Sequence, residues 1–381
     1  MFMDFFKSKK KPEDNSKFSP LKVVFILKRR EDYSSKMVNG NYSSVATGMW
    51  NSSKFVSDML NSMGIKSYQV MVVDNNDIDK VCADYKPTHV FIEGLWVVPD
   101  KFDILKKLHP NIVWTVRCHS ETPFLAQEGI AMNWIAEYWK RNVYVAANSP
   151  RMQHELKTYF DGLVGPLTPI VYSTCYYYPL LTNYYPIVKD WDEPGRWDNN
   201  ESNRIDIGCF GAIRLLKNQL IQASAAYEYA QSIGKKLYFH INSGRVEGNA
   251  DPVLKNIRSY FDQLSDAELV EHSWSGHKEF LSNLSYMNLL LQCSFSETYN
   301  IVTADALSCG VPVVVSSEIP YAKSGIADPT CSEDIVQKIR SVMGNSRYSV
   351  AQNVDGLNQY SLTTKKIWKK YFENELAFMG L

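Results

Sequence analysis

Short apolar runs of strand length alternate with longer amphipathic stretches along most of this sequence. The first run, LKVVFILK at 21–28, is apolar at nearly every position, as in a parallel strand that is buried on both faces. Strands that alternate with helices predict a doubly wound parallel sheet, whose ligands bind beyond the carboxyl ends of the strands. The predicted strands of the first half are 21–28, 67–74, 88–94, 111–119, 142–149 and 167–174.

The alternation stops once and then resumes, which predicts two domains. Residues 183–203 are rich in Pro, Asn and Asp and fit an interdomain linker. We therefore expect a flexible tail at 1–20, a first α/β domain at 21–182 and a second at 204–360. The basic and aromatic stretch at 361–381 predicts a closing helix. A chain of 381 residues suits two domains of ordinary size.

Two acidic residues flank the start of a predicted helix in the second half. Glu297 and Asp305 have seven residues between them and precede the apolar run at 311–317. With a helix predicted over 297–308, the two acids fall about two turns apart. The unpaired N–H groups of such a helix N-terminus could bind a diphosphate, with the acids holding hydroxyls on either side. The alternative is an acidic first turn that only complements the helix dipole.

Two cations stand between a predicted strand at 205–210 and a helix that begins near Lys217. Gly211 marks the turn, and Arg214 and Lys217 follow it. The planar fork of an arginine and the point charge of a lysine commonly hold a diphosphate together. The alternative is two solvated charges. Cations are unfavourable at a helix N-terminus, and this favours a bound anion.

Together the two segments resemble the retaining glycosyltransferases of the GT-B fold, specifically family 4. That family carries a Gly-x-x-Arg-x-x-x-Lys-like segment, here Gly211-Ala-Ile-Arg214-Leu-Leu-Lys217 with one residue fewer before the lysine, and a Glu-x7-Glu motif, here Glu297-x7-Asp305. The resemblance implies two Rossmann-like domains facing a cleft, with the last helix crossing back onto the first domain. It implies that Arg214 and Lys217 neutralise the donor diphosphate. It further implies that Glu297 contacts the donor sugar and Asp305 the ribose hydroxyls.

The sequence departs from the family pattern in two further places. The second acid, Asp305, is one methylene shorter than the usual Glu. Thr298-Tyr299-Asn300 replaces the usual Gly-Phe-Gly, so the backbone there is less free to approach a phosphate. We expect Thr298, Tyr299, Asn300 and Ile301 to line the donor site together with the two acids.

The loop after the first predicted strand is the candidate acceptor side. It contains Gly40, Asn41, Ser43 and Ser44, a composition that suits acceptor or phosphate contact but also occurs in loops that only connect elements. The loop has no GxGxxG pattern, and this excludes a Rossmann dinucleotide site there.

His119 ends the predicted strand at 111–119, and Glu121 lies beside it. The family places a histidine at such a strand end, facing the donor sugar, so the resemblance implies a catalytic role for His119. We assign Glu121 to the acceptor side. The alternative for His119 is a hydrogen-bonded histidine at the sheet edge. His89 lies within an apolar strand and is expected to be a satisfied core residue.

The resemblance implies sugar transfer from a nucleotide diphosphate, such as a UDP-sugar, with retention of configuration. The nucleotide-sugar is a substrate, and no cofactor is expected. Two cations and a helix N-terminus can stabilise the departing diphosphate without a metal. The histidines and cysteines show no metal-ligand spacing and no HExxH motif.

Composition narrows the class of protein further. The net charge is zero, so there is no broad basic surface for nucleic acid or anionic membranes. The seven cysteines are scattered without a CxxC pair, as in a reducing compartment, and we expect a cytoplasmic protein. No apolar stretch approaches the roughly 18 residues of a membrane span, and the N-terminus lacks the layout of a signal peptide.

The acceptor remains open between two classes. One is a saccharide or lipid-linked glycan. The other is hydroxymethylcytosine in phage DNA, because some bacteriophages encode GT-B enzymes that glycosylate this base; the protein would then act in the host cytoplasm. A DNA acceptor requires base flipping and a basic stripe, for which 7–11, 28–30 and Lys36 are candidates. Nucleotide-sugar epimerases and inactive binding modules share the fold and are further alternatives.

Overall fold

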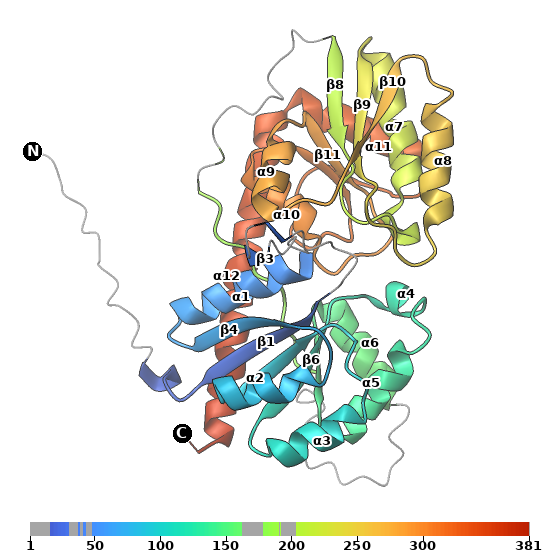
Figure 1. Cartoon of the computed structure of the whole chain (residues 1–381). Helices are drawn as coiled ribbons and strands as arrows, with labels where there is room; N and C mark the ends of the chain where they lie inside the picture. The colour runs from blue at the N-terminus through green and yellow to red at the C-terminus, as the bar shows by residue number, and fades with distance from the viewer. Residues whose placement is uncertain are drawn as a thin grey trace, which may run out of the picture.

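A computed structural model describes residues 16–29, 37–38, 41–42, 48–161, 178–189, 191 and 203–380 of the chain. Two parallel β-sheets, each covered by helices, form an N-terminal domain and a C-terminal domain (Figure 1). The N-terminal domain is the lower, blue to green half of the figure, and the C-terminal domain is the upper half. The predicted strand at 167–174 lies outside the described residues.

The N-terminal domain has a five-stranded sheet in the order β4-β1-β5-β6-β7, with every pair parallel. Parallel pairing places all carboxyl ends at one edge of the sheet, where the chain turns into the next helix. The strands are β1 (Lys22–Lys28), β4 (Lys66–Val72), β5 (His89–Glu93), β6 (Val113–Cys118) and β7 (Tyr144–Ala147). The helices are η1 (Ser16–Phe18), α1 (Gly48–Ser62), α2 (Asp77–Tyr85), α3 (Lys101–Leu108), α4 (Thr122–Leu125), α5 (Ala131–Lys140) and α6 (Pro150–Asp161). Two short strands, β2 (Met37–Val38) and β3 (Asn41–Tyr42), form a separate antiparallel pair.

The C-terminal domain has a six-stranded parallel sheet in the order β10-β9-β8-β11-β12-β13. In both sheets the strand order reverses beside the first strand of the domain, which is the arrangement of a doubly wound fold. The strands are β8 (Arg204–Gly208), β9 (Lys236–Asn242), β10 (Ala267–His272), β11 (Leu289–Gln292), β12 (Val313–Ser316) and β13 (Ile326–Ala327). The helices are η3 (Leu215–Lys217), α7 (Gln219–Ser232), α8 (Asp251–Phe261), α9 (His277–Ser285), α10 (Ile301–Ser308) and α11 (Ser332–Gly344).

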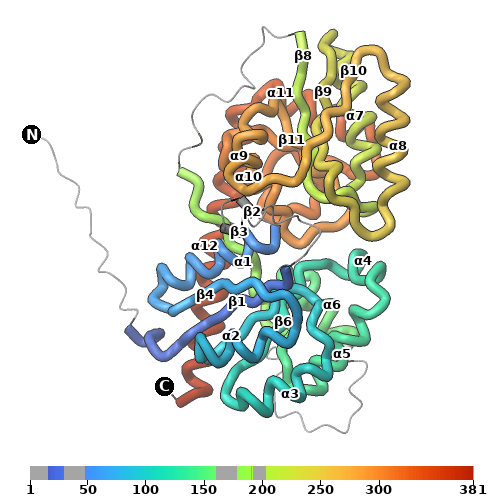
Figure 2. The backbone as a smooth tube through the Cα atoms, in the orientation of Figure 1, coloured from blue at the N-terminus to red at the C-terminus, as the bar shows by residue number. Residues whose placement is uncertain are grey.

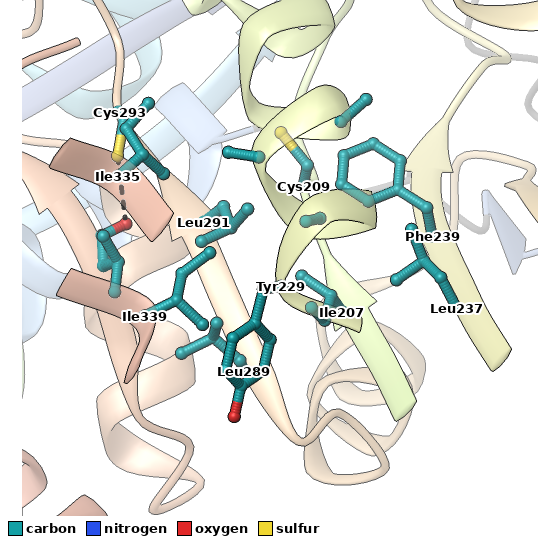
Figure 3. Close-up of a cluster of buried hydrophobic side chains, with 14 of the residues drawn as sticks. Ile207, Cys209, Tyr229, Leu237, Phe239, Leu289, Leu291, Cys293, Ile335 and Ile339 are labelled. Carbon is teal, nitrogen blue, oxygen red and sulfur yellow. Dashed lines mark hydrogen bonds between the residues drawn. The ribbon is translucent and has the colours of Figure 1, made fainter. Parts of the chain in front are cut away.

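Alternate residues of the central strands build the core on one face of this second sheet. Leu237 and Phe239 of β9, and Leu289 and Leu291 of β11, point toward α7 and α11 and are fully buried (Figure 3). Each such side chain stabilises the domain by about 1.5–3 kcal/mol relative to exposure. Cys293 in the same cluster is a small buried side chain whose thiol contacts the carbonyl of Val314 (Figure 3).

The helix α12 (Ser346–Phe378) connects the two domains. It has 33 residues, which corresponds to about 50 Å, and it extends from the C-terminal domain along the N-terminal domain (Figures 1 and 2). Its first half packs into the C-terminal core through Val350, Val354 and Leu357. Its second half places Trp368 and Phe372 in the N-terminal core. The helix therefore holds both domains through buried apolar contacts.

Candidate active site

A cavity of about 450 Å³, part of it open to solvent, lies between the two domains at the carboxyl ends of the C-terminal strands. The helix α1 of the N-terminal domain forms one wall. The other wall comes from the segments that follow β8, β9, β10 and β11, as expected for ligand binding in a parallel sheet. The lining residues are Gly48, Asn51, Gly211, Asn242, Trp274, Ser275, His277, Phe280, Ile301, Val302 and Asp305.

Lys217 and Glu297 form an ion pair beside this cavity. Lys217 Nζ lies 2.5 Å from Glu297 Oε1, and Asn300 Nδ2 donates to the same oxygen at 3.1 Å. Gly211, at φ +111°, lies next to the lysine, so that an added Cβ would come within 4.0 Å of Lys217 Nζ. The structure thus brings together two residues that the sequence analysis took from separate segments.

Arg214 contacts both domains. Its Nε donates to Glu247 Oε2 at 2.6 Å, and its guanidinium lies 4.9 Å from the ring centroid of Phe124 in α4. Glu247 also pairs with Arg245. Each of the two predicted diphosphate cations therefore has a carboxylate partner. Both cations keep further N–H donors beyond these contacts.

The loop that carries Glu297 is not helical, contrary to the prediction of a helix over 297–308. The helix α10 begins at Ile301, because Asn300 adopts φ +60° and caps it: Asn300 Oδ1 accepts from the N–H of Thr303 at 3.0 Å. Asparagine is one of the few residues with a side chain that tolerates this left-handed conformation. Asn300 thus fulfils a backbone requirement that would otherwise favour glycine.

Thr298 and Tyr299 have different surroundings from those of Glu297. Thr298 Oγ1 donates to the carbonyl of His119 at 2.9 Å and accepts from Asn148 Nδ2 at 3.2 Å, so it fixes the loop to the N-terminal domain. The Tyr299 side chain is buried in the C-terminal core, with its ring near those of Tyr321 and Tyr360. Its side chain therefore acts in packing, whereas Ile301 reaches the cavity.

Asp305 lies on α10 at the base of the cavity, and its side chain is only 2% exposed. Its Oδ1 accepts hydrogen bonds from Tyr185 at 2.9 Å and from His277 Nε2 at 2.8 Å. Burial raises the pKa of Asp305, against the opposing effect of the His277 hydrogen bond. The same hydrogen bond raises the pKa of His277. Asp305 therefore holds the hydroxyl of Tyr185 and the ring of His277 in place.

His119 is held by a buried carboxylate. Its Nε2 lies 2.5 Å from Glu93 Oε2, and Arg117 donates to Glu93 Oε1 at 2.8 Å. Burial alone would raise the pKa of Glu93, but the charges of Arg117 and His119 hold it below its ordinary value of 4.5. The arrangement fixes the His119 ring, as a carboxylate does for many catalytic histidines. Arg117 is fully buried and stacks on Trp368 of α12.

Glu121, expected on the acceptor side, lies in an ion-pair network that bridges the domains. It is 2% exposed and accepts from Ser149 Oγ at 2.5 Å and from Arg151 Nε at 3.2 Å. Arg151 in turn holds Glu318 of the C-terminal domain. Burial raises the pKa of Glu121.

The remaining acceptor-side predictions fall mostly outside the described residues. This applies to Gly40, Ser43 and Ser44, whereas Asn41 lies in β3, paired with Val38. His277, to which the sequence analysis gave no role, lines the cavity. His89 is a satisfied core residue as predicted, with ring partners in Thr88 and Glu375.

Two negative findings apply to the described part of the chain. No group of three or more His, Cys, Asp or Glu side chains there has the geometry of a metal site. None of the helices there combines the length and the apolar character that a membrane crossing needs.

No protein-family model and no curated protein matches this sequence. Solved structures match in fold. Trehalose-6-phosphate synthase OtsA superposes with a TM-score of 0.65 at 8% identity, over 93% of this chain and 99% of that chain. Sucrose-phosphate synthase from Thermosynechococcus elongatus gives 0.59 at 13% identity, over 93% and 100%. HepE from Anabaena, solved with UDP and glucose, gives 0.56 at 12% identity, over 95% and 100%.

These matches and the two parallel-sheet domains define the GT-B fold, which confirms the predicted fold class. The likeness extends over nearly the whole chain of each neighbour. At these identities the likeness concerns the fold, and a shared fold does not imply a shared activity.

Proposed function

We propose that this protein is a retaining glycosyltransferase that moves a sugar from a nucleotide-diphosphate donor to a hydroxyl acceptor. The observation that carries the proposal is the Lys217–Glu297 pair, at 2.5 Å, at the edge of the interdomain cavity. A cation for the leaving diphosphate and a carboxylate for the sugar then stand side by side. This is the arrangement that transfer from a nucleotide-sugar requires.

Stabilisation of the leaving group is the main demand of the reaction. When the bond between the anomeric carbon and the diphosphate oxygen breaks, negative charge develops on the diphosphate. Lys217, Arg214 and the N–H groups of Ile301 and Val302 at the start of α10 can share that charge. Each preorganised donor of this kind can lower the barrier by about 3–4 kcal/mol. Transfer of this kind needs no metal in the proposed scheme.

In the proposed scheme the acceptor hydroxyl attacks the face of the sugar from which the diphosphate departs. The hydroxyl proton passes to the departing phosphate oxygen, and the configuration is retained. Glu297 orients the sugar hydroxyls without forming a covalent bond. His119 faces the donor sugar from the N-terminal domain, with its ring held by Glu93. Closure of the two domains excludes water, which would otherwise hydrolyse the donor.

We propose a UDP-sugar as the donor and a saccharide hydroxyl as the acceptor. The support is the neighbouring fold: HepE was solved with UDP and glucose, and the other neighbours are named as trehalose-6-phosphate and sucrose-phosphate synthases. The alternative of a DNA acceptor depends on the basic residues at 7–11, 28–30 and 36, of which the structure describes only Lys28 and Arg29. A reducing, cytoplasmic location fits the six described cysteines, which are all unpaired.

A nucleotide-release panel tests the proposal. UDP-, GDP- and dTDP-sugars are combined with sugar phosphates, free sugars, plain DNA and hydroxymethylcytosine DNA. We expect release of UDP that depends on a saccharide acceptor. If nucleotide is released only with hydroxymethylcytosine DNA, the acceptor is the modified base and not a saccharide. No release with any pair would contradict the transferase.

A further inference from the structure

His277 lines the cavity and makes a hydrogen bond to a buried carboxylate. It lies at the first position of α9, and its Nε2 is 2.8 Å from Asp305 Oδ1. Tyr185 donates to the same carboxylate oxygen at 2.9 Å. Oδ1 therefore accepts two hydrogen bonds from the protein, and these fix the Nε2 edge of the imidazole.

The exposed fractions of the two side chains differ. The Asp305 side chain is 2% exposed and that of His277 is 24% exposed. Within the described part of the chain, His277 Nδ1 has no hydrogen-bond partner. His277 therefore lines the cavity with an imidazole that a carboxylate holds at Nε2, and its Nδ1 can donate to or accept from a hydroxyl.

Aromatic contacts fix the plane of the His277 ring. Phe55 of α1 meets His277 edge-on at 5.8 Å and Tyr185 at 5.1 Å between centroids. Because Phe55 belongs to the N-terminal domain, the ring is held from both sides of the cavity. A side chain with so little rotational freedom loses little entropy when it binds a ligand.

The neighbours of His277 indicate which end of a nucleotide-sugar lies there. Trp274 and Phe280, close in sequence to His277, give the cavity an aromatic wall, and Arg245 covers Trp274 at 5.0 Å from the ring centroid. Lys217 lies instead beside Gly211, on another part of the lining. Flat apolar walls suit a base, and a hydroxyl partner beside them suits the attached ribose.

We propose that His277, through Nδ1, makes the direct contact with a ribose hydroxyl of the nucleotide donor, and that Asp305 acts on the ribose only by positioning His277. The inference rests on the proposed function, because it requires a nucleotide in this cavity. It reassigns the ribose contact that the resemblance gave to Asp305. His277 becomes a residue that selects ribonucleotide over deoxyribonucleotide donors.

A pair of nearly isosteric substitutions separates the two nitrogens. In His277→Asn the amide lies where Nδ1 was, next to the first ring carbon. In His277→Gln the amide lies one bond further out, where Nε2 meets Asp305. The proposal predicts that His277→Asn keeps the ribose contact and that His277→Gln loses it.

The experiment is calorimetric titration of the full-length protein with UDP, 2′-deoxy-UDP and 3′-deoxy-UDP. We expect the wild type to bind UDP roughly 5-fold more tightly than one of the deoxy analogues, as for a single hydrogen bond. His277→Asn should keep this ratio, whereas His277→Gln should bind UDP and the analogues equally. His154→Ala, an exposed histidine of α6, is the control. Melting curves establish that each variant is folded.

Two results would overturn the inference and leave the proposed function standing. One is UDP binding by the wild type with no preference over either analogue. The other is an unchanged preference in His277→Gln together with its loss in Asp305→Asn, which would make Asp305 the direct contact. Failure of the wild type to bind any nucleotide would overturn the proposed function itself, and the inference with it.

Discussion

Arg151 of the N-terminal domain holds Glu318 of the C-terminal domain with two parallel hydrogen bonds, at 3.0 and 2.6 Å. Glu318 also accepts from the backbone N–H of Glu297 at 3.3 Å, and Arg151 is anchored by the buried Glu121. The ion pair therefore joins the contact between the two domains to the position of the Glu297 loop. Bidentate arginine–carboxylate pairs combine strength with a fixed geometry.

We predict that Glu318→Ala lowers kcat/KM about 5-fold, which corresponds to the roughly 1 kcal/mol of a partly exposed pair. Arg151→Ala should lower kcat/KM further than Glu318→Ala does, because it also leaves the buried Glu121 without its cation. The double variant should be no worse than Arg151→Ala alone. Initial rates at several donor concentrations test this, and simple addition of the two single effects would contradict a shared role.

Lys217→Ala should lower kcat about 100- to 1,000-fold, because it removes a preorganised charge from the leaving group. The matched control is Lys236→Ala, since Lys236 also pairs with a glutamate, Glu268, but on the exposed surface of the C-terminal domain. The control should keep the wild-type rate. Circular dichroism shows whether both variants fold, and a wild-type kcat in folded Lys217→Ala would remove the lysine from the mechanism.

Glu93→Gln should destabilise the N-terminal domain by about 3 kcal/mol at neutral pH, because Arg117 loses its buried partner. The pH dependence follows from the lowered pKa of Glu93. A carboxyl whose pKa falls on folding stabilises the protein above its ordinary value of 4.5, and that stabilisation is lost as the pH falls through the lowered value.

Urea unfolding of the wild type and Glu93→Gln between pH 3 and 7 measures this effect. The difference in unfolding free energy should be largest at neutral pH and should shrink as the solution becomes more acidic. A constant difference across the range would mean that the charge of Glu93 contributes nothing to stability.

Trp368→Ala should destabilise the protein by about 3–5 kcal/mol, as expected for loss of a large core side chain. Trp368 is fully buried on α12 against Phe25 and Phe91. Leu362→Ala on the same helix is the control, since Leu362 is 52% exposed. Thermal melts compare the two. Equal melting temperatures would show that α12 does not stabilise the N-terminal domain.

The sequence predicts the strands of the first sheet and β8 of the second well, because continuous apolar runs such as β1 are unambiguous over their length. It also singles out Arg214 and Lys217, since cations at the start of a helix are unusual, and their role in binding a diphosphate stays a prediction. It misplaces the start of α10 by four residues, because the left-handed conformation of Asn300 is not visible as a breaker in a helical pattern.

The partners of the site residues could not be predicted from the sequence. Asp305 meets Tyr185 from 120 positions away, and Arg214 meets Glu247 from 33 positions away. No local pattern marks such pairs, because they depend on how the crossover connections bring strand ends together. His277 is a similar case, since its place in the cavity follows from the packing of α9 against α10.

Calorimetric titration of UDP into the wild type, Lys217→Ala and Lys236→Ala measures nucleotide binding at the proposed diphosphate site without requiring the acceptor. We expect binding to the wild type, at least 10-fold weaker binding to Lys217→Ala and unchanged binding to Lys236→Ala. Binding of equal strength to Lys217→Ala, or none to the wild type, would contradict a nucleotide diphosphate site at Lys217.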